Sequence, residues 1–333
     1  MKVTLSHALP PGNKASPARP RPLPKGRAVL GQISDMDLRL LRVFKAVVEC
    51  GGMAAAELEL NIGTSTVSRH VKDLETRLGL SLCRRGRGGF ALTPEGERIY
   101  AETLRLLAST DAFRHSVDDI HQRMGGQIHL AVFDKTASNP QARIARAIAL
   151  FRQQAPEVAL NLHVGSINQI ERGVIDGIYQ VGVIPAHRSS ETLVYDDLFG
   201  EIMQLYAGQG HALFDARDDV LNWDSLRAYP FAGLGYHSPN MEITHRERLL
   251  RAATGFDQES VATLILSGAF LGFLPDHYAA SFVSVGQMRA MAPALFRYDC
   301  TFVGITRYLL QPARVTQAFR QCLLLAHQTG RPS

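Results

Sequence analysis

The sequence predicts a protein of mixed fold class, in which a mainly helical N-terminal head precedes a longer α/β region. Residues 53–78 contain two short amphipathic helices separated by a tight turn. A glycine-rich basic segment and one long helix follow over residues 79–124. Beyond the glycines at 125 and 126, strand-like and helix-like segments alternate, which is typical of a parallel sheet covered by helices.

The length and charge of the chain set limits on its class. The 333 residues are enough for two or three domains, and a hydrophobic content of 46% is enough for well-formed cores. The net charge of +5 is unevenly spread, because residues 1–34 contain six basic residues and no acid, which leaves the remainder one unit negative. Net charge therefore does not indicate nucleic-acid binding by the folded part; local clusters of cations do.

Several classes of protein find no support in the sequence. The four cysteines, at positions 50, 83, 300 and 322, stand apart from one another, as buried thiols in a reducing compartment do. None of the 12 histidines falls in a recognised ligand spacing, so we expect no metal and no cofactor. No catalytic motif occurs, and no run approaches the roughly 20 apolar residues of a membrane span. We expect a cytoplasmic protein that is not an enzyme.

The first predicted helix runs from Asp37 to Cys50 and is stopped by the glycines at 51 and 52. Its buried side is expected to consist of Leu38, Leu41, Phe44, Ala46, Val47 and Val48. Residues 1–35 before it are rich in Pro, Arg and Lys and lack the apolar segment of a signal peptide, so we expect them to be disordered.

A helix-turn-helix is predicted over residues 53–78. Residues 53–60 form its first helix, and Asn61-Ile62-Gly63 forms the turn, because Asn and Gly tolerate a left-handed backbone. The apolar stripe of the second helix is Val67, Val71, Leu74 and Leu78. Its other face combines hydroxyls with cations, as a helix that enters a major groove does: Thr64, Ser65, Ser68, Arg69 and Lys72. The alternative is a pair of amphipathic helices in an ordinary helical domain.

Residues 79–92 predict two short strands around a basic, glycine-rich tip. Arg85 and Arg87 at this tip could reach phosphates or the minor groove, which makes the hairpin a candidate wing. Thr93-Pro94-Glu95 then combines a hydroxyl cap, a proline at the first position and an acid near the positive end of the dipole, which is a strong start for a helix.

The long helix is expected to reach about Met124 and to carry a coiled-coil seam. Apolar residues occupy six of the eight heptad positions: Ile99, Leu106, Phe113, Val117, Ile120 and Met124, with Thr103 and Thr110 between them. The heptad period favours a homodimer, in which two recognition helices would meet two half-sites. A helix packed on its own domain would show a similar stripe.

The α/β region contains two groups of alternating elements. Strands are expected at 127–134, 158–164, 179–184, 201–207, 231–234, 268–275 and 296–307, and helices from Asn139-Pro140 onward and at 167–176, 242–253, 260–267 and 312–328.

The head resembles the LysR-type transcriptional regulators. The residues that carry the resemblance are Ala55-Ala56, Val67-Ser68-Arg69, Leu74-Glu75, Leu78-Gly79, Arg85 and Leu92-Thr93-Pro94-Glu95-Gly96, and Gly173-Val174-Ile175-Asp176 and residues 271–275 extend it. The resemblance implies a winged helix-turn-helix over 36–93, a dimerisation helix over 94–125 and an effector-binding regulatory domain over 126–333. That domain would resemble the two-lobed periplasmic binding proteins, with lobe 1 at 126–187 and 289–333 and lobe 2 at 188–288.

The same resemblance implies partners: double-stranded promoter DNA, a small-molecule effector, a homodimer that assembles further into a homotetramer, and contact with RNA polymerase. Family members begin near Met36, so we favour residues 1–35 as an upstream extension; the alternative is an arm that adds weak phosphate contacts. The family commonly has Ser-Gln at Gly63-Thr64 and Phe at Cys83, so the operator sequence does not carry over and packing under the wing is expected to be looser.

Candidate effector-binding residues follow from where strands end. Parallel sheets bind ligands beyond the carboxyl ends of their strands, and helix N-termini attract anions. These rules indicate Thr136, Ser138, Ser166 and Asn168, with Gly235 and Pro275 from the opposite lobe. An organic anion is expected, although Asp134 could favour a cationic or neutral effector. The alternative reading is that these polar residues only cap their own helices.

Two rival functions remain from the second half alone, namely a solute-binding protein and a small-molecule enzyme that uses the two-lobed cleft. The 60-residue head and the missing signal peptide count against the first. A redox sensor with paired cysteines in the second lobe is disfavoured, because residues 188–288 contain no cysteine.

Overall fold

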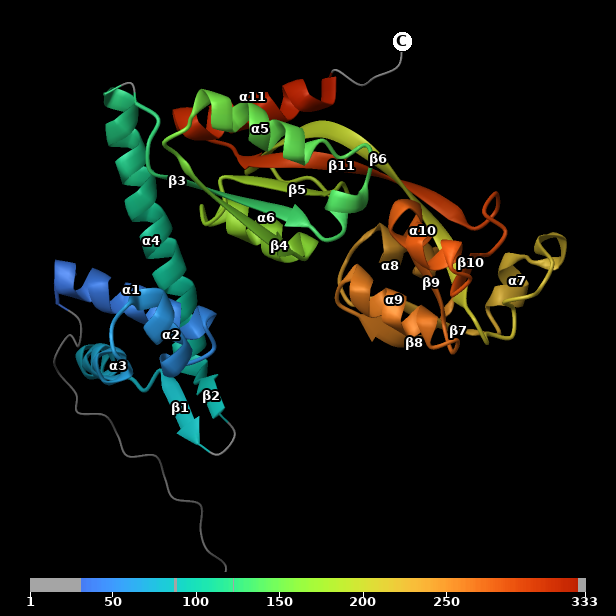
Figure 1. The fold of residues 1–333 in the computed structure, drawn as a ribbon, viewed down its shortest axis with the longest axis horizontal. Helices are drawn as coiled ribbons and strands as arrows, with labels where there is room; N and C mark the ends of the chain where they lie inside the picture. Colours follow the sequence, from blue (N-terminus) through green and yellow to red (C-terminus); the bar gives the residue numbers. More distant parts are fainter. Residues whose placement is uncertain (1–30, 87–88, 122, 329–333) are drawn as a thin grey trace, which may run out of the picture. The chain divides into compact units, whose positions relative to one another are not determined.

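The computed structural model describes residues 31–86, 89–121 and 123–328 (Figure 1). The chain divides into two compact units, with the boundary between Glu97 and Arg98. We call them the N-terminal and C-terminal units and describe each by itself. Residues 1–30, which belong to the segment expected to be disordered, and Arg87 at the predicted tip of the wing lie outside the described residues.

The N-terminal unit is a three-helix head with a β-hairpin. Its elements are α1 (Asp35–Glu49), α2 (Met53–Leu60), α3 (Thr64–Leu78), β1 (Cys83–Gly86), β2 (Gly89–Leu92) and the first residues of α4 (Pro94–Ile120). The predicted turn is confirmed: Asn61 has φ 50° and ends α2 in the left-handed conformation. The strands β1 and β2 pair antiparallel, as the wing prediction requires.

The core of this unit differs in part from the predicted one. Val67, Val71 and Leu74 of α3 are buried as expected. On α1 the buried residues are Leu40, Val43, Phe44, Ala46 and Val47, together with Asp37. Leu38, Leu41 and Val48 are only half-buried, because the face of α1 that meets α2 and α3 is rotated towards residues 40 and 43.

The start of α1 is held by polar contacts that include Ser34. Ser34 and Asp37 form a capping box, in which the Ser34 backbone N–H donates to Asp37 Oδ2 at 2.8 Å. Ser34 and Asp35 therefore belong to the folded head, so the predicted boundary at 35/36 is slightly too late. Asp37 also accepts two hydrogen bonds from Arg77 of α3, Nε to Oδ1 at 2.5 Å and Nη2 to Oδ2 at 3.0 Å. The Arg77 guanidinium and the Ser34 hydroxyl hold the pKa of Asp37 well below its ordinary value.

The junction between hairpin and α4 explains the Thr-Pro-Glu-Gly motif. The Thr93 hydroxyl donates to the Ser81 carbonyl at 2.6 Å and accepts from the Gly96 N–H at 2.8 Å, so it caps α4 and ties it to the hairpin. A Cβ on Gly96 would lie 2.0 Å from the Leu82 carbonyl oxygen, so only glycine fits there.

The C-terminal unit is built on one continuous mixed sheet that serves two lobes. Its strands are β3 (Gln127–Phe133), β4 (Ala159–Gly165), β5 (Val181–Pro185), β6 (Leu193–Gly208), β7 (Pro230–Leu234), β8 (Leu250–Gly255), β9 (Leu271–Pro275), β10 (Met288–Ala290) and β11 (Arg297–Arg307). The strand order is β4-β3-β5-β11-β6-β9-β7-β8, and β10 pairs with β6. Parallel pairs occur within each lobe, as predicted, whereas β6 and β11 pair antiparallel to each other.

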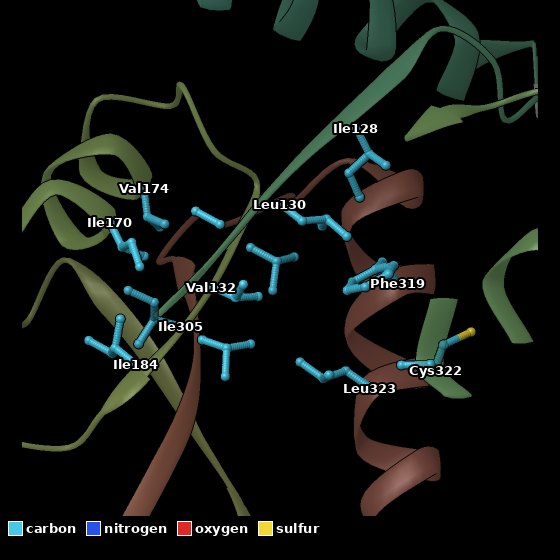
Figure 2. Close-up of a cluster of buried hydrophobic side chains, with 14 of the residues drawn as sticks. Ile128, Leu130, Val132, Ile170, Val174, Ile184, Ile305, Phe319, Cys322 and Leu323 are labelled. Atoms are coloured by element: carbon cyan, nitrogen blue, oxygen red, sulfur yellow. The ribbon is translucent and has the colours of Figure 1, made fainter. Parts of the chain in front are cut away.

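The first lobe packs helices on both faces of its part of the sheet. These helices are α5 (Ile144–Gln154), α6 (Ile167–Ile175) and α11 (Arg314–Gln328). Figure 2 shows Phe319 and Leu323 of α11 on one side of Leu130 and Val132, and Ile170 and Val174 of α6 on the other. Burial of these aliphatic and aromatic side chains is the main stabilising contribution to the lobe.

The second lobe carries α7 (Trp223–Leu226), α8 (Pro239–Arg246), α9 (Gln258–Leu266) and α10 (Asp276–Ser284). Alternate residues of its strands enter two separate clusters: Leu205 and Phe273 join one, and Tyr206 and Leu274 join the other. Both faces of this part of the sheet are therefore covered.

The long strands β6 and β11 run from one lobe into the other (Figure 1). Phe199 and Phe302 belong to the first core, whereas Met203 and Cys300 belong to the second. The change of lobe lies in the middle of both strands, further along the chain than the predicted boundaries at 187/188 and 288/289.

Three predicted helices have different limits. Asn139 does not cap α5, which begins at Ile144, because Asn139 Oδ1 instead accepts from the Gln141 N–H at 2.8 Å. The helix expected over 242–253 ends at Arg246, since Arg248 is left-handed (φ 53°), and β8 follows. The long helix α4 ends at Ile120 rather than near Met124.

We predict that Asp37→Asn lowers the stability of the N-terminal unit by about 1–3 kcal/mol, because it weakens the buried hydrogen bonds to Arg77. The lowered pKa of Asp37 means that its contribution is present at neutral pH and is lost as the pH falls, so the difference from wild type should shrink in acid. Thermal unfolding followed by circular dichroism measures both effects. Asp73→Asn, on an exposed position of α3, is the control; equal loss in both variants would contradict the prediction.

Candidate functional site

The exposed face of α3 carries the predicted DNA-binding side chains. Ser65, Arg69 and Lys72 are exposed and Ser68 is half-buried. Positions 65, 68, 69 and 72 lie on one face of a helix. The opposite face is fixed in the core by Val67, Val71 and Leu74. The helix therefore presents two cations and two hydroxyls outward from a rigid support.

Thr64 stands apart from this group. Its hydroxyl donates to the Glu57 carboxylate of α2, and its backbone N–H donates to the same oxygen at 3.3 Å. Glu57 thus caps α3 from outside, which compensates for the missing side chain at Gly63. Glu57 was not singled out from the sequence; an acid shortly before a helix that starts at glycine is the signal that could have found it.

The wing is attached to α3 by a second acid. Glu75 Oε1 accepts from the backbone N–H groups of Leu82 and Cys83 at 2.7 and 3.2 Å. The half-buried Cys83 packs against the core of the head, at the site where looser packing was expected. The strand β1 includes Arg85, whose side chain lies outside the described structure, as does Arg87.

In the C-terminal unit, the turn after β3 is tied to the second lobe by two groups of contacts. Lys135 forms an ion pair with Glu259 of α9 and lies 4.5 Å from the centre of the Tyr278 ring of α10. The Tyr278 hydroxyl donates to Glu259 Oε2 at 2.9 Å. Ser138 Oγ lies 3.0 Å from His277 Nδ1, and His277 Nε2 lies 2.9 Å from Glu201 Oε2. These contacts hold the two lobes together.

A cavity of about 20 Å³ lies between the lobes, where the ends of strands from both meet the N-termini of α6, α8 and α9. It is lined by Phe133, Ile167, Pro185, Glu201, Met203, Leu234, Ser238, Pro239, Asn240, Gln258, Tyr298 and Cys300. This volume is about that of one water-sized group. The arrangement suits a ligand that is bound by both lobes at once.

Asp134 lies beside this cavity and is poorly satisfied. Its Oδ2 accepts from the Gln258 N–H at 2.7 Å across the lobes, whereas Oδ1 is buried without a hydrogen-bond partner among the described residues. Burial is the main cause that raises the pKa of Asp134 to about 6, and the charges of Asp257 and Glu201 act in the same direction.

None of the six predicted effector-binding residues belongs to the lining of the cavity. Ser138 contacts His277, and the buried Thr136 hydroxyl donates to the Phe133 carbonyl at 3.1 Å. Ser166 forms a capping box on α6, and the exposed Asn168 faces a different hollow near Arg105.

From the second lobe, a Cβ on Gly235 would meet Thr254 and Phe256 at 2.8 Å, and Pro275 pairs with Met203 in the sheet. The structure adds residues that sequence reasoning did not select as ligand candidates, namely Glu201, Tyr236, Gln258 and His277.

A larger hollow of about 1010 Å³ lies elsewhere in the first lobe, along Arg143, Asp197, Leu324 and His327. His327 Nε2 accepts from the Arg143 N–H at 3.0 Å, so this polar group is already satisfied. The smaller cavity, with its unsatisfied polar groups, is therefore the better candidate. No group of three or more His, Cys, Asp or Glu side chains within residues 31–86, 89–121 and 123–328 is arranged to hold a metal ion.

The seam predicted on α4 is exposed in its second half. Phe113, Val117 and Ile120 are 71, 38 and 79% exposed. The helix contacts its own lobe through other positions: Asp111 Oδ2 accepts from Gln127 at 3.0 Å and Asp119 accepts from the Arg314 N–H at 3.2 Å.

The remaining seam positions differ. Ile99 and Leu106 are half-buried. Met124 lies beyond the end of α4 and packs against the first core, so it is not part of a helical seam.

We predict that the free energy of unfolding of the wild type falls relative to that of Asp134→Asn as the pH rises from about 4 to about 6. The expected change is roughly 3 kcal/mol at most. A raised pKa means that the folded state binds the proton more tightly than the unfolded chain, so stability is lost when the proton leaves. Melting temperatures of both proteins across this range measure the effect. Asp299→Asn, an exposed carboxylate of β11, is the control; a constant difference between wild type and Asp134→Asn would contradict the prediction.

Two family models match the chain. Residues 38–97 match the model described as a bacterial regulatory helix-turn-helix protein of the lysR family, and residues 121–327 match the LysR substrate binding domain. A relative from Pseudomonas aeruginosa, the HTH-type transcriptional activator BauR, is 40% identical over 297 residues, which cover 89% of this chain and 97% of BauR.

Solved structures share the fold. CbnR, a LysR family transcriptional regulator, matches with a TM-score of 0.59 at 18% identity, and full-length CbnR complexed with its target DNA matches with a TM-score of 0.58 at 19% identity. Each match covers 87% of this chain and 99% of the CbnR chain. The residues that the two family models match include the helix-turn-helix, the wing and both lobes described above. The chain therefore belongs to the LysR family of transcriptional regulators, and it combines the family's helix-turn-helix with its substrate-binding domain.

Proposed function

We propose that this regulator reads promoter DNA with α3 and the wing, and that a small molecule bound between the lobes controls it. The observation that carries the proposal is the outward face of α3, where Arg69 and Lys72 project from a helix whose other side is buried. Arg69 is suited to bidentate contact with a guanine, and Lys72 and the wing arginines are suited to phosphates. The 40% identity to an activator supports activation as the outcome.

We further propose that the regulator is a homodimer joined through α4, and that dimers assemble into a tetramer. Phe113, Val117 and Ile120 form an apolar stripe that the helix does not use within its own lobe. A second copy of α4 would bury these side chains and bring two α3 helices to two half-sites. Contact with RNA polymerase, and residence in the cytoplasm where the promoter lies, complete the proposal.

Control by an effector would act through the contacts between the lobes. A ligand that binds the closed cleft more tightly than an open one shifts the population towards closure. Because β6 and β11 are shared, closure would change how the lobes are presented to neighbouring copies, and through them the spacing of the α3 pairs.

The rival functions, a solute-binding protein or an enzyme, are not favoured, because residues 38–97 form a regulatory helix-turn-helix. The described helices include none with the length and apolar character needed to cross a bilayer.

We predict that Arg69→Ala weakens binding to the promoter upstream of the protein's own gene by roughly 10- to 100-fold, which corresponds to the loss of one base contact. Binding to unrelated DNA should change much less. A gel-shift titration with non-specific competitor at two salt concentrations measures both affinities.

Lys45→Ala removes a cation from α1 that is paired with Glu49, and it serves as the matched control. Unchanged selective binding by Arg69→Ala, with folding confirmed by circular dichroism, would contradict the assignment of α3.

We predict that Phe113→Asp combined with Ile120→Asp raises the dissociation constant of the dimer at least roughly tenfold, because both substitutions place charge in a buried interface. Both side chains are exposed within the chain, so each copy should still fold. Sedimentation equilibrium gives the constant. Ala112→Asp, an exposed position on another side of α4, should leave the dimer intact; equal dissociation in both proteins would argue against the seam.

A further inference from the structure

Several buried polar atoms in and beside the interlobe cavity lack hydrogen-bond partners among the described residues. Gln258 is only 2% exposed and lines the cavity, and its Oε1 has no partner within the described part of the chain. Asp134 Oδ1 is also buried without a partner there, whereas Asp134 Oδ2 accepts a hydrogen bond from the Gln258 backbone N–H. The Tyr236 hydroxyl is likewise buried without a partner there. Asn240, another lining residue that is 2% exposed, carries a donor without a partner there, Nδ2. Buried polar atoms of native proteins are normally satisfied, so these atoms indicate that a polar group is missing from the cavity.

The charge around the cavity is negative. Glu201 is 5% exposed and lines the cavity, and its contact is with the His277 imidazole rather than with a guanidinium or an ammonium group. Asp134 and Asp257 lie close enough for their charges to raise the pKa of the Tyr236 hydroxyl, although its burial contributes most. The nearby cation Lys135 is engaged by Glu259. Asp134 is a buried carboxylate with an unpartnered oxygen, which is costly, and a ligand cation would offset that cost.

The volume limits what can enter. In this arrangement of the lobes, about 20 Å³ has room for one water-sized group. A primary ammonium group has this size, carries three donors and has no acceptor. A hydroxyl group has a similar size, but it brings no charge to the carboxylates.

We propose that the effector carries a primary ammonium group, which enters this cavity and donates hydrogen bonds to Asp134 Oδ1 and Gln258 Oε1. The rest of the effector extends from the cavity along the seam between the lobes. This inference rests on the proposed control of the protein by a ligand in the cleft, and it replaces the organic anion expected from helix N-termini with a molecule that is cationic at its buried end.

The test uses the full chain and three small probes of similar size: ethylammonium chloride, ethanol and sodium acetate, each at equal concentration and with ionic strength matched by sodium chloride. Ethylammonium should raise the melting temperature of the wild type by mass action, and ethanol and acetate should not. Calorimetric titration should give an ethylammonium dissociation constant that rises at least roughly tenfold in Asp134→Asn, as for the loss of a charged hydrogen bond. Asp299→Asn should bind like the wild type.

Gln258→Leu provides a second variant that leaves every carboxylate in place, and it should also weaken ethylammonium binding. Stabilisation by acetate instead, dependent on Asp134 or Gln258, would overturn the ammonium assignment while leaving the cleft as the effector site. Ethylammonium binding that is unchanged in both variants, or no binding of any probe, would overturn it as well. The DNA-binding function is judged separately by the Arg69→Ala gel shift.

Discussion

The antiparallel pairing of β6 with β11 is the constraint on which the C-terminal unit depends. Both strands belong to both lobes, and the core changes between Phe199 and Met203 on one strand and between Phe302 and Cys300 on the other. The ladder shifts register between Phe302 and Val303, next to the stacked rings of Phe199 and Phe302, 4.7 Å apart. The lobes therefore cannot separate without bending this ladder, so closure and opening must be absorbed at the crossing.

The contacts across the cleft are of two kinds. Lys135 with Glu259 and Ser138 with His277 join the lobes near the surface, where solvent screens the charges and each contact contributes modestly. Asp134 with the Gln258 backbone is more buried, and it leaves oxygens unsatisfied on both residues. A closed state that carries such a cost is poised to be stabilised by a ligand that removes it, which is what a population shift requires.

Acidic residues fix the geometry of the DNA-binding head, although they are not expected to touch DNA. Asp37 joins α1 to α3, Glu57 caps α3 and Glu75 holds the first wing strand. These carboxylates bind Arg77 and backbone N–H groups of the head, whereas Arg69 and Lys72 of α3 face outward. This division explains why the head can bind DNA although the net charge of the folded chain is slightly negative.

The sequence by itself determined the local elements. The helical period of Val67, Val71 and Leu74, the left-handed Asn61 and the Thr93-Pro94 start each express a short-range rule, and the structure has them where the rules place them. The prediction failed for residues 250–253, where a helical pattern is overridden by pairing with β7. The prediction also failed for Met124. This residue fits the seven-residue period of a coiled-coil seam, but it packs against the core of the first lobe.

Only the tertiary structure decided the site. The fold brings together four residues that are far apart in sequence and belong to no short motif: Glu201 and Gln258 line the cavity, and Asp134 and Tyr236 lie beside it. Whether a polar residue caps its own helix, as Ser166 does, or is left unsatisfied, as Gln258 Oε1 is, depends on what packs against it from the other lobe. Periodicity and capping are properties of neighbours along the chain, whereas burial and satisfaction are properties of neighbours in space, and for this reason the elements could be read from the sequence and the ligand chemistry could not.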